Sequence, residues 1–265
     1  MSIKRKRSFV CKHCNRKFDI EIYDSINANI DPELKKEVLN GDLYRYTCPH
    51  CNKINFISYP IVYHDMSDKY MIYSNSFEFI ILENLNSPME NLKKDFNGLL
   101  KDYKIYGSVS SLELGTKISF LDVGLDLRLG FLTLSFLMYN INNAEAFKDE
   151  PFTDIYARLI GKKLMVCLDG PKGHMEQEFP LEIYVYFKKT IPNLDNIDDR
   201  YFNLESAETF LRANPEFIEN EVEVLICDDE QIAASLLVYP FMEGQYKPGD
   251  RVNFFLENKL YAATV

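Results

Sequence analysis

Hydrophobic residues occupy every second position from Phe18 to Ile22, with acidic residues between them. This period of two predicts a half-buried strand. The spacing changes after Asp31-Pro32, where Leu34, Val38 and Leu39 recur at helical intervals and Gly41 follows. This pattern predicts a short helix that Asp31 caps and that Gly41 ends in the left-handed conformation. Short strands are expected at residues 43–46, 54–59 and 70–73.

Helical periodicity dominates the middle of the chain. Ser87-Pro88-Met89-Glu90 has the form of a capping box, and apolar residues recur at helical spacing over residues 89–103, which predicts a helix there. Residues 122–141 are a second helical candidate, so densely apolar that more than one face should be buried. A buried strand would also fit this second segment.

The pattern from Pro151 onward is mostly that of strands. Expected strands cover residues 155–160, 164–168, 181–187, 222–226 and 236–239 and lie on both sides of residues 247–250. A hairpin is expected across residues 169–174, and a helix over residues 204–213 that Pro215 would stop. The second half of the chain is therefore predicted to be β-rich.

The bulk composition is that of a folded protein. The chain has 265 residues, of which 46% are hydrophobic and 26% are charged, and this length favours two domains over one. The net charge of −10 is uneven, because residues 1–74 hold 12 Lys and Arg against 9 Asp and Glu, and the rest holds 18 against 31. An acidic remainder argues against a nucleic-acid backbone as the partner.

Targeting segments are not expected. The basic run Lys4–Arg7 leads directly into Phe9 without an apolar stretch or a cleavage site, so it does not resemble a secretory signal. The longest apolar run, Leu129–Tyr139, is shorter than the roughly 20 residues that a spanning helix needs. We expect a cytoplasmic protein without a membrane partner, in which paired cysteines indicate a metal more often than a disulfide.

Two C-x-x-C pairs carry the strongest chemical signal. They are Cys11-Lys12-His13-Cys14 and Cys48-Pro49-His50-Cys51. A two-residue spacing lets one tight turn present both sulfurs to one ion, and two such turns complete a tetrahedral site. We therefore predict one zinc ion held by Cys11, Cys14, Cys48 and Cys51. His13 and His50 lie inside the turns and should point away from the ion into solvent.

The residue after each pair supports this prediction. Asn15 and Asn52 stand where such a turn needs positive φ, and asparagine tolerates the left-handed region better than any residue except glycine. Phe18 and Phe56 should then begin strands that cover the site. A four-cysteine set leaves no open position for water or substrate, which predicts structural rather than catalytic zinc. Free thiols, a redox dithiol and an iron–sulfur cluster are the alternatives.

These motifs resemble the CpXC family, a bacterial domain family named for such paired cysteines. Besides the two pairs, the resemblance rests on Phe18–Tyr23, Asp24-Ser25-Ile26-Asn27, Asp31-Pro32-Glu33-Leu34, Tyr63-His64-Asp65 and Gly124–Arg128. It covers about the first half of the chain and implies metal binding by the four cysteines. It implies no activity. The chain departs from the family pattern with Lys12 in place of proline and with asparagine where glycine is usual.

Catalytic pairs are weaker candidates. His64 and Asp65 could form a general acid and base, but adjacent residues of a strand point to opposite faces. Cys167 and His174 flank the expected hairpin turn as a possible nucleophile and base, but Cys167 lies in an apolar run where a buried thiol is commoner. Cys227 has the same interpretation.

The remaining clusters of charged residues are expected to be solvated surface rather than binding sites. Two acidic groups could bind Mg²⁺ or Ca²⁺, namely Asp195, Asp198, Asp199 and Asp228, Asp229, Glu230. Neither group has the EF-hand spacing, and solvated loops explain both better. The basic run Lys4–Arg7 is expected to be a frayed terminus that serves solubility.

Together these features predict an α+β protein. Residues 1–150 should form a zinc-ribbon module with a helical extension, and residues 151–265 a β-rich domain. We expect a non-enzymatic zinc-binding protein whose metal supports a surface for a protein partner. The alternatives are a nucleic-acid-binding ribbon and a hydrolase with its site in the C-terminal half.

Overall fold

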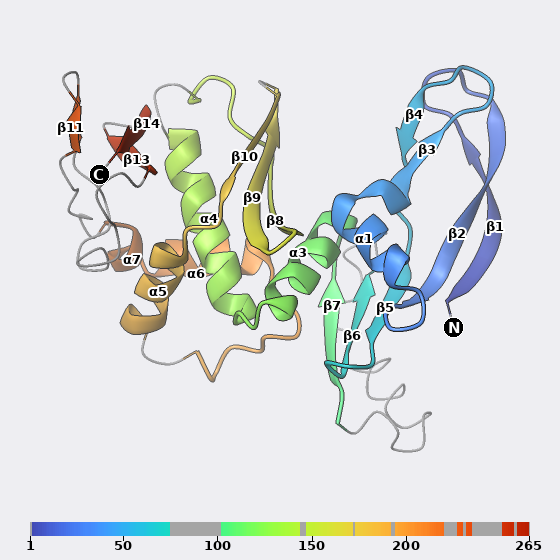
Figure 1. Cartoon of the computed structure of the whole chain (residues 1–265), viewed down its shortest axis with the longest axis horizontal. Coiled ribbons are helices and arrows are strands. Elements are labelled where there is room, and N and C mark those ends of the chain that lie inside the picture. The colour runs from blue at the N-terminus through green and yellow to red at the C-terminus, as the bar shows by residue number, and fades with distance from the viewer. Residues whose placement is uncertain are drawn as a thin grey trace. The chain divides into compact units, whose positions relative to one another are not determined.

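The computed structural model (Figure 1) describes residues 2–74, 102–143, 147–171, 173–191, 194–219, 227–229, 232–234, 251–256 and 259–264. Contacts between residues divide the chain into two compact units. Unit 1 comprises Met1–Val123 with Asp198–Tyr201, and unit 2 comprises Gly124–Ile197 with Phe202–Val265. Helices and sheets are mixed along the chain, which confirms the α+β class. The domain division at residue 150 stays a prediction.

A five-stranded sheet forms the centre of unit 1. Its order is β1-β2-β5-β6-β7, and its strands are β1 (Ile3–Val10), β2 (Lys17–Asn27), β5 (Ile61–Asp65), β6 (Tyr70–Ser74) and β7 (Lys104–Ser108). β1/β2 and β5/β6 run antiparallel, and β2/β5 and β6/β7 run parallel. The predicted alternation in β2 is confirmed, because Phe18, Ile20 and Ile22 are buried and the residues between them are exposed.

The expectation of a frayed N-terminus is wrong. Lys4–Arg7 lie within β1, which pairs with β2 from Lys4 opposite Tyr23 to Val10 opposite Lys17. The side chains of β1 are largely exposed, so the strand gave no period-two signal. Backbone hydrogen bonds to β2 hold it in the sheet instead.

Helix α1 (Pro32–Asn40) forms where the sequence predicted it. Gly41 ends it with a φ of 74°, a left-handed conformation that glycine adopts without strain. Asp31 is not its side-chain cap, because its carboxylate accepts a hydrogen bond from the backbone N–H of Ser2 at 3.3 Å. Leu34 and Val38 are buried, and α1 contacts β2.

Helix α3 (Ser111–Asp122) had no counterpart in the prediction. The Ser110 hydroxyl caps it by accepting the N–H of Glu113 at 3.1 Å. α3 contacts α1, β6 and β7, and it is buried nearly all round. Its buried positions mix polar and apolar residues, so the helix shows no amphipathic period, which is why the pattern missed it.

A small two-stranded sheet also belongs to unit 1. It pairs β3 (Arg45–Thr47) with β4 (Ile54–Phe56). The strand expected from residue 43 begins at Arg45, because Asp42–Tyr44 form a turn of 3-10 helix. The strand expected over residues 54–59 ends at Phe56, so Phe56 ends a strand rather than beginning one.

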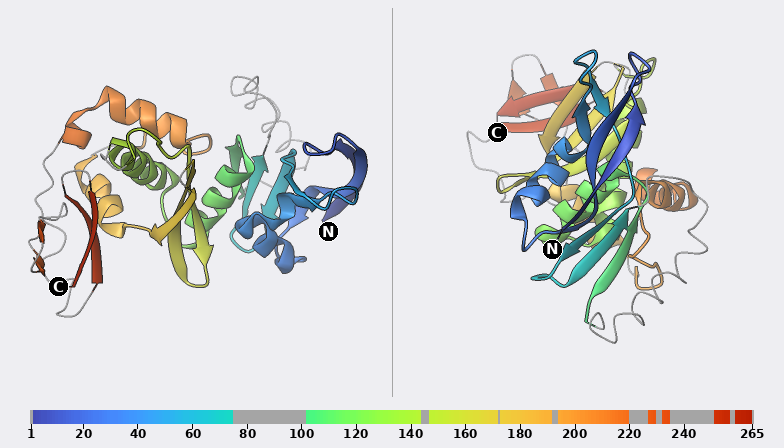
Figure 2. Two further views of the ribbon diagram at one scale, coloured as in Figure 1. Left: turned by 90° about the horizontal axis from the view of Figure 1, so that it is seen from above. Right: turned by 90° about the vertical axis from the view of Figure 1, so that its right-hand side faces the viewer.

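Unit 2 contains a three-stranded antiparallel sheet of order β10-β9-β8. Its strands are β8 (Asp154–Ile160), β9 (Lys163–Gly170) and β10 (Gly173–Glu178). The predicted hairpin between β9 and β10 is confirmed. Helix α4 (Leu127–Asn143) contacts β8, α5 (Leu181–Thr190) and α6 (Leu204–Ala213) and is central to the unit (Figure 2). No helix among the described residues has the length and apolar character needed to cross a membrane.

Residues 181–187 were expected to form a strand, and this prediction is wrong. They begin α5, which buries Tyr184 and Phe187 three positions apart and leaves Leu181 52% exposed. The Phe187 ring packs edge-on against Phe136 of α4 at 5.7 Å between centroids. Contact with α4 therefore overrides the strand preference of the β-branched and aromatic residues in this segment.

The two helices predicted within unit 2 are confirmed. Residues 122–141 form α4 rather than a strand, although the helix begins later than expected, at Leu127. The helix predicted over residues 204–213 is α6, with the bounds Leu204–Ala213. A short helix, α7 (Glu216–Glu219), follows it.

The end of the chain contributes two strand pairs. They are β11 (Cys227–Asp229) with β12 (Ile232–Ala234), and β13 (Arg251–Leu256) with β14 (Lys259–Thr264). β13 follows residues 247–250, as expected. The strands predicted at 222–226 and 236–239 lie outside the described residues, as does nearly all of the helix predicted over 89–103.

Candidate metal centre

Each cysteine pair lies in the loop of a β-hairpin. Cys11 and Cys14 lie between β1 and β2, and Cys48 and Cys51 lie between β3 and β4. The two hairpin loops lie side by side at one end of unit 1 (Figure 1).

The two loops have the same backbone conformation. In the first, the N–H of Asn15 donates to the carbonyl of Cys11 at 2.9 Å; in the second, the N–H of Asn52 donates to the carbonyl of Cys48 at the same distance. Asn15 and Asn52 both have a φ of 56°. The prediction that both asparagines adopt the left-handed conformation is confirmed.

The four sulfur atoms converge. The Sγ atoms of Cys11 and Cys51 are 3.6 Å apart, those of Cys14 and Cys48 are 3.7 Å apart, and all four lie within 4.8 Å of one another. Sulfurs bound to a tetrahedral ion at about 2.3 Å are roughly 3.8 Å apart, and a disulfide requires about 2.05 Å. The described arrangement therefore has the spacing of a four-thiolate metal site, and its cysteines are free.

Asn55 supports this site from β4, although no sequence motif pointed to it. Its side-chain amide donates to Cys11 Sγ at 3.5 Å, and its carbonyl oxygen accepts the N–H of Lys12 at 3.0 Å. Asn55 is 3% exposed. It thus joins the second hairpin to the first cysteine loop. A polar residue between Ile54 and Phe56 in a short strand was the available signal.

Hydrogen bonds, burial and neighbouring sulfurs give the thiols of Cys11 and Cys51 different pKa values. Burial opposes ionisation of Cys11, but the N–H groups of His13 and Cys14 and the Asn55 amide lower its pKa to about 6. At Cys51 the N–H of Lys53 favours the thiolate, but burial and the neighbouring sulfurs raise the pKa to about 12. Four thiolates this close repel one another, and a bound cation relieves that repulsion.

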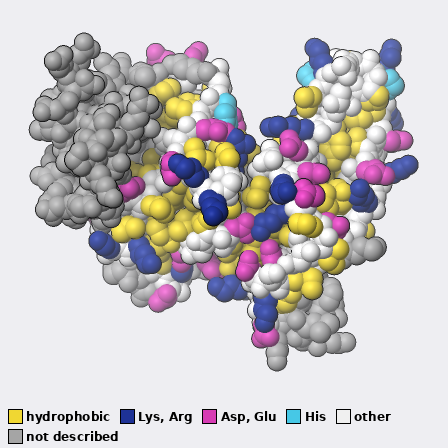
Figure 3. Space-filling model, in the orientation of Figure 1, with side chains coloured by type: hydrophobic (Ala, Val, Ile, Leu, Met, Phe, Trp, Pro, Cys, Tyr) yellow, Lys and Arg dark blue, Asp and Glu magenta, His cyan; other side chains and the backbone are white. Residues whose placement is uncertain are grey.

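The two histidines of the loops point away from the sulfurs, as predicted. The Nε2 atom of His13 lies 3.2 Å from the carbonyl oxygen of Ile54, and that of His50 lies 3.1 Å from the carbonyl oxygen of Lys17. Both residues are exposed, and histidine side chains (cyan) surface at the tip of the two hairpins in Figure 3.

Residues 9–129 match the family model described as CpXC protein. This part of the chain carries a CpXC domain. The match includes all four cysteines and confirms the resemblance seen in the sequence. No curated protein and no solved structure matches the chain significantly.

The CpXC domain does not pair His64 with Asp65 as acid and base. Asp65 ends β5 and accepts the N–H groups of Ser67 and Asp68 at 3.0 and 3.1 Å, so it holds the following turn. The His64 ring lies against Tyr103, with 5.2 Å between centroids, and burial lowers its pKa although Asp65 opposes this shift.

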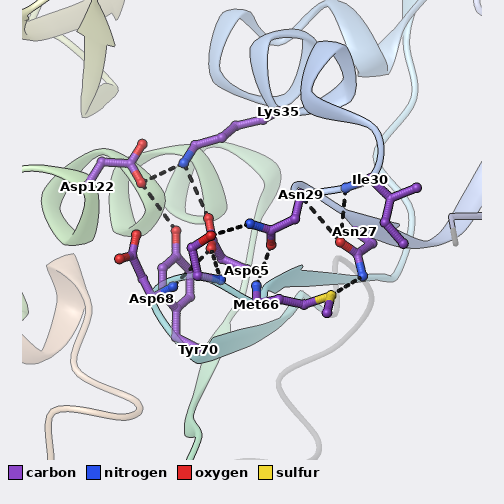
Figure 4. A network of polar contacts seen from close by, with 10 residues as sticks. Asn27, Asn29, Ile30, Lys35, Asp65, Met66, Asp68, Tyr70 and Asp122 are labelled. Atoms are coloured by element: carbon purple, nitrogen blue, oxygen red, sulfur yellow. Dashed lines mark hydrogen bonds and ion pairs between the residues drawn. The ribbon is translucent and has the colours of Figure 1, made fainter.

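A second polar cluster of the CpXC domain surrounds Lys35 (Figure 4). The Lys35 ammonium lies 2.7 Å from Asp122 and 3.5 Å from Asp65, and Tyr70 donates to Asp122 at 3.4 Å. Burial raises the pKa of Asp122, and Lys35 opposes that shift. Asp68 completes a group of three nearby carboxylates. These contacts join α1, β5 and α3, so the cluster is part of the packing of unit 1.

Cys167 and His174 also come together, on the paired strands β9 and β10 of unit 2. Burial raises the pKa of the Cys167 thiol, and Arg158 opposes that shift. A thiol held protonated is a poor nucleophile, so this pair does not have the electrostatics of a hydrolase dyad. Cys227 lies in β11.

Among the described residues, the acidic groups weighed as cation ligands form no cluster that could hold a metal ion. Asp198 pairs with the Arg200 guanidinium at 2.5 Å, which lowers the pKa of the Asp198 carboxyl. Asp228 and Asp229 lie in β11, and Glu230 lies outside the described residues.

Proposed function

We propose that the CpXC domain holds one structural Zn²⁺ ion through Cys11, Cys14, Cys48 and Cys51, and that the metal organises a non-enzymatic surface for a protein partner. The observation that supports this most strongly is the convergence of four free sulfurs at tetrahedral spacing. Four thiolates select zinc among the common divalent ions, and they leave no position for a substrate. Free thiols fit a reducing compartment, and we propose the cytoplasm.

The metal has a clear structural task. β3 and β4 have three residues each, too few to stay paired without further support. An ion shared by both loops ties this hairpin to the one formed by β1 and β2, and its binding free energy becomes folding free energy.

Exposed apolar side chains next to the loops support a protein partner. Val10 precedes Cys11 and is 54% exposed, and Ile54 and Phe56 of β4 are 61% and 42% exposed. Within β4, Asn55 faces the sulfurs, so its two neighbours face the other way. Apolar residues held rigidly at a surface are typical of interaction sites.

Nucleic-acid binding receives less support from the same region. Two of the four basic residues of β1 already have acidic partners in β2: Arg5 pairs with Asp24 at 2.6 Å, and Lys4 pairs with Glu21 at 3.9 Å. These pairs reduce the positive charge available to phosphates.

Metal analysis of the purified full chain tests the proposal. We expect one tightly held zinc per chain and its loss in Cys48→Ser. His50→Ala is the matched control, because it alters the same loop without removing a ligand and should keep the zinc. A parent chain without metal, or with an iron–sulfur chromophore, would contradict the proposal.

The partner surface is tested separately. Affinity capture with the zinc-loaded chain should recover a protein that Ile54→Ser with Phe56→Ser fails to capture while retaining zinc. Salt-dependent binding to mixed oligonucleotides that is lost on neutralising Lys6 and Arg7 would favour the nucleic-acid alternative instead.

A further inference from the structure

The three-stranded sheet of unit 2 has two chemically different faces. Strand pairing places Tyr156, Cys167 and Glu176 side by side across β8, β9 and β10, and directly paired residues share a face. The opposite face carries Ile155, Ala157, Val166 and Leu168, which are buried. β8 contacts helix α4. The first face instead gathers titratable side chains: Tyr156, Arg158, Cys167, Asp169, His174 and Glu176.

Three of these side chains lie within reach of one ion. The ligand atoms of Cys167, His174 and Glu176 lie within 4.8 Å of one another. Glu176 Oε1 is 2.8 Å from His174 Nε2 and 3.9 Å from Cys167 Sγ. Nitrogen, oxygen and sulfur ligands of a tetrahedral zinc ion are separated by roughly 3.3–3.6 Å. The two distances from Glu176 differ from these values by well under an ångström.

The histidine is oriented as metal-bound histidines are. His174 Nδ1 lies 2.7 Å from Asp169 Oδ1, and a carboxylate on one ring nitrogen directs the lone pair of the other toward a metal. Both ring nitrogens of His174 face carboxylate oxygens, Nδ1 that of Asp169 and Nε2 that of Glu176. A divalent ion bound between Nε2, Glu176 and Cys167 would have one nitrogen, one oxygen and one sulfur ligand.

The burial and charge around these three ligands suit a bound divalent ion. Cys167 is fully buried, whereas the side chains of His174 and Glu176 are 43% and 31% exposed. The ligands thus form a site that is closed beneath by sulfur and open to solvent above. Arg158 pairs with Glu176. The Cys167 thiolate and the Asp169 and Glu176 carboxylates would carry three negative charges, which the Arg158 guanidinium and one divalent ion would balance. A metal ion binds the thiolate form of cysteine, so its binding to Cys167 would release the thiol proton to solvent.

We propose that Cys167, His174 and Glu176 form a second metal site, specific for a zinc-class divalent transition metal, with Asp169 positioning His174. Three protein ligands leave one coordination position for water or another small ligand. This arrangement differs from the closed four-cysteine site, and three ligands should hold the ion less tightly than four thiolates. The second site does not depend on the first.

Co²⁺ titration of the zinc-loaded full chain tests the proposal, because Co²⁺ in a four-coordinate site with one thiolate has visible d–d bands and one sulfur-to-cobalt charge-transfer band. We expect one Co²⁺ per chain with both features, while the tightly held zinc stays in place. His174→Gln should abolish the d–d bands. Cys167→Ser should remove the charge-transfer band, and Asp169→Asn should weaken binding about 10- to 100-fold.

Glu178→Gln is the matched control. Glu178 lies on the same face of β10 and pairs with Lys163 at 2.9 Å, so its replacement should leave Co²⁺ affinity unchanged. Because His174 and Asp169 are exposed, their variants should fold, and far-ultraviolet circular dichroism with zinc content verifies this. Co²⁺ binding that is absent from the parent, or equal in His174→Gln and the parent, would overturn the proposal.

Discussion

Asn15 and Asn52 show how a single backbone angle prepares the metal site. Both side chains are exposed, so neither residue is held in place by packing. Both have a φ of 56°, which costs a residue with a Cβ atom roughly 1–2 kcal/mol. Asparagine reduces that cost, and glycine removes it.

This angle predicts opposite effects for two substitutions at position 52. Asn52→Gly should keep stability within about 1 kcal/mol of the parent, and Asn52→Val should lower it by about 1–2 kcal/mol. Valine should also speed the transfer of zinc to a chelator, because the loop closes less readily around the ion. Urea unfolding and chelator kinetics measure both effects. Equal behaviour of the two variants would show that this angle does not limit the loop.

No sequence pattern predicted the structural role of Lys117. It is fully buried in α3, where its ammonium lies 2.8 Å from Glu113 and donates to the carbonyl of Gly107. Lysine, glutamate and two serines on a helix usually indicate a solvent-exposed face. In the folded chain these four residues of α3 are buried.

Removing this buried cation should be costly. We expect Lys117→Met to lower the free energy of unfolding by about 3–5 kcal/mol, because the Glu113 carboxylate would remain buried without its partner. Adding Glu113→Gln should recover part of that loss. Urea denaturation of the two variants and the parent measures this coupling. A single variant within about 1 kcal/mol of the parent would contradict the assigned role.

At the scale of elements, Asp126 fixes where α4 begins. Its carboxylate accepts the backbone N–H of Arg128 at 2.8 Å and that of Leu129 at 3.4 Å, and it pairs with the Arg128 guanidinium at 2.6 Å. Burial opposes ionisation of Asp126, but the contacts with Arg128 outweigh it and lower the pKa of the carboxyl.

The lowered pKa determines the sign of a pH effect. A carboxyl whose pKa is lower in the folded state stabilises the protein at neutral pH, and this contribution is lost as the pH falls below the unfolded value of about 3.9. Asp126→Ala should cost about 1–2 kcal/mol at pH 7. Asp126→Asn should keep the cap but flatten the acid side of the stability profile. Urea unfolding between pH 3 and pH 7 tests both, and parallel profiles for Asp126→Asn and the parent would refute the assignment.

The sequence predicted elements where the signal was local. The cysteine loops, their asparagines and Gly41 follow from rules that span a few residues, so the candidate site was predictable almost completely. Long-range contacts decided the rest. Asn55 reaches Cys11 only because two hairpins meet, α5 is a helix because it packs on α4, and β1 is ordered because β2 lies beside it.

At the scale of the whole molecule, the family match and the packing both place the four-cysteine cluster in the first part of the chain. The match stops at residue 129, close to the end of the first segment of unit 1 at Val123. Each unit has its own buried residues, with Ile22, Tyr63 and Ile72 in unit 1 and Val166 and Phe187 in unit 2. A unit with its own core can open locally without the other.

Loss of zinc from the four-cysteine site should therefore be felt in unit 1 alone. In Cys48→Ser we expect faster amide hydrogen exchange within residues 8–74, largest in the two hairpins that share the ion, because their pairing depends on metal binding. Exchange in β8–β10 and α4 should match that of the parent, and His50→Ala should match it throughout. Exchange that rises equally in both units of Cys48→Ser would mean that zinc stabilises the whole chain cooperatively, contrary to the division into two separately packed units.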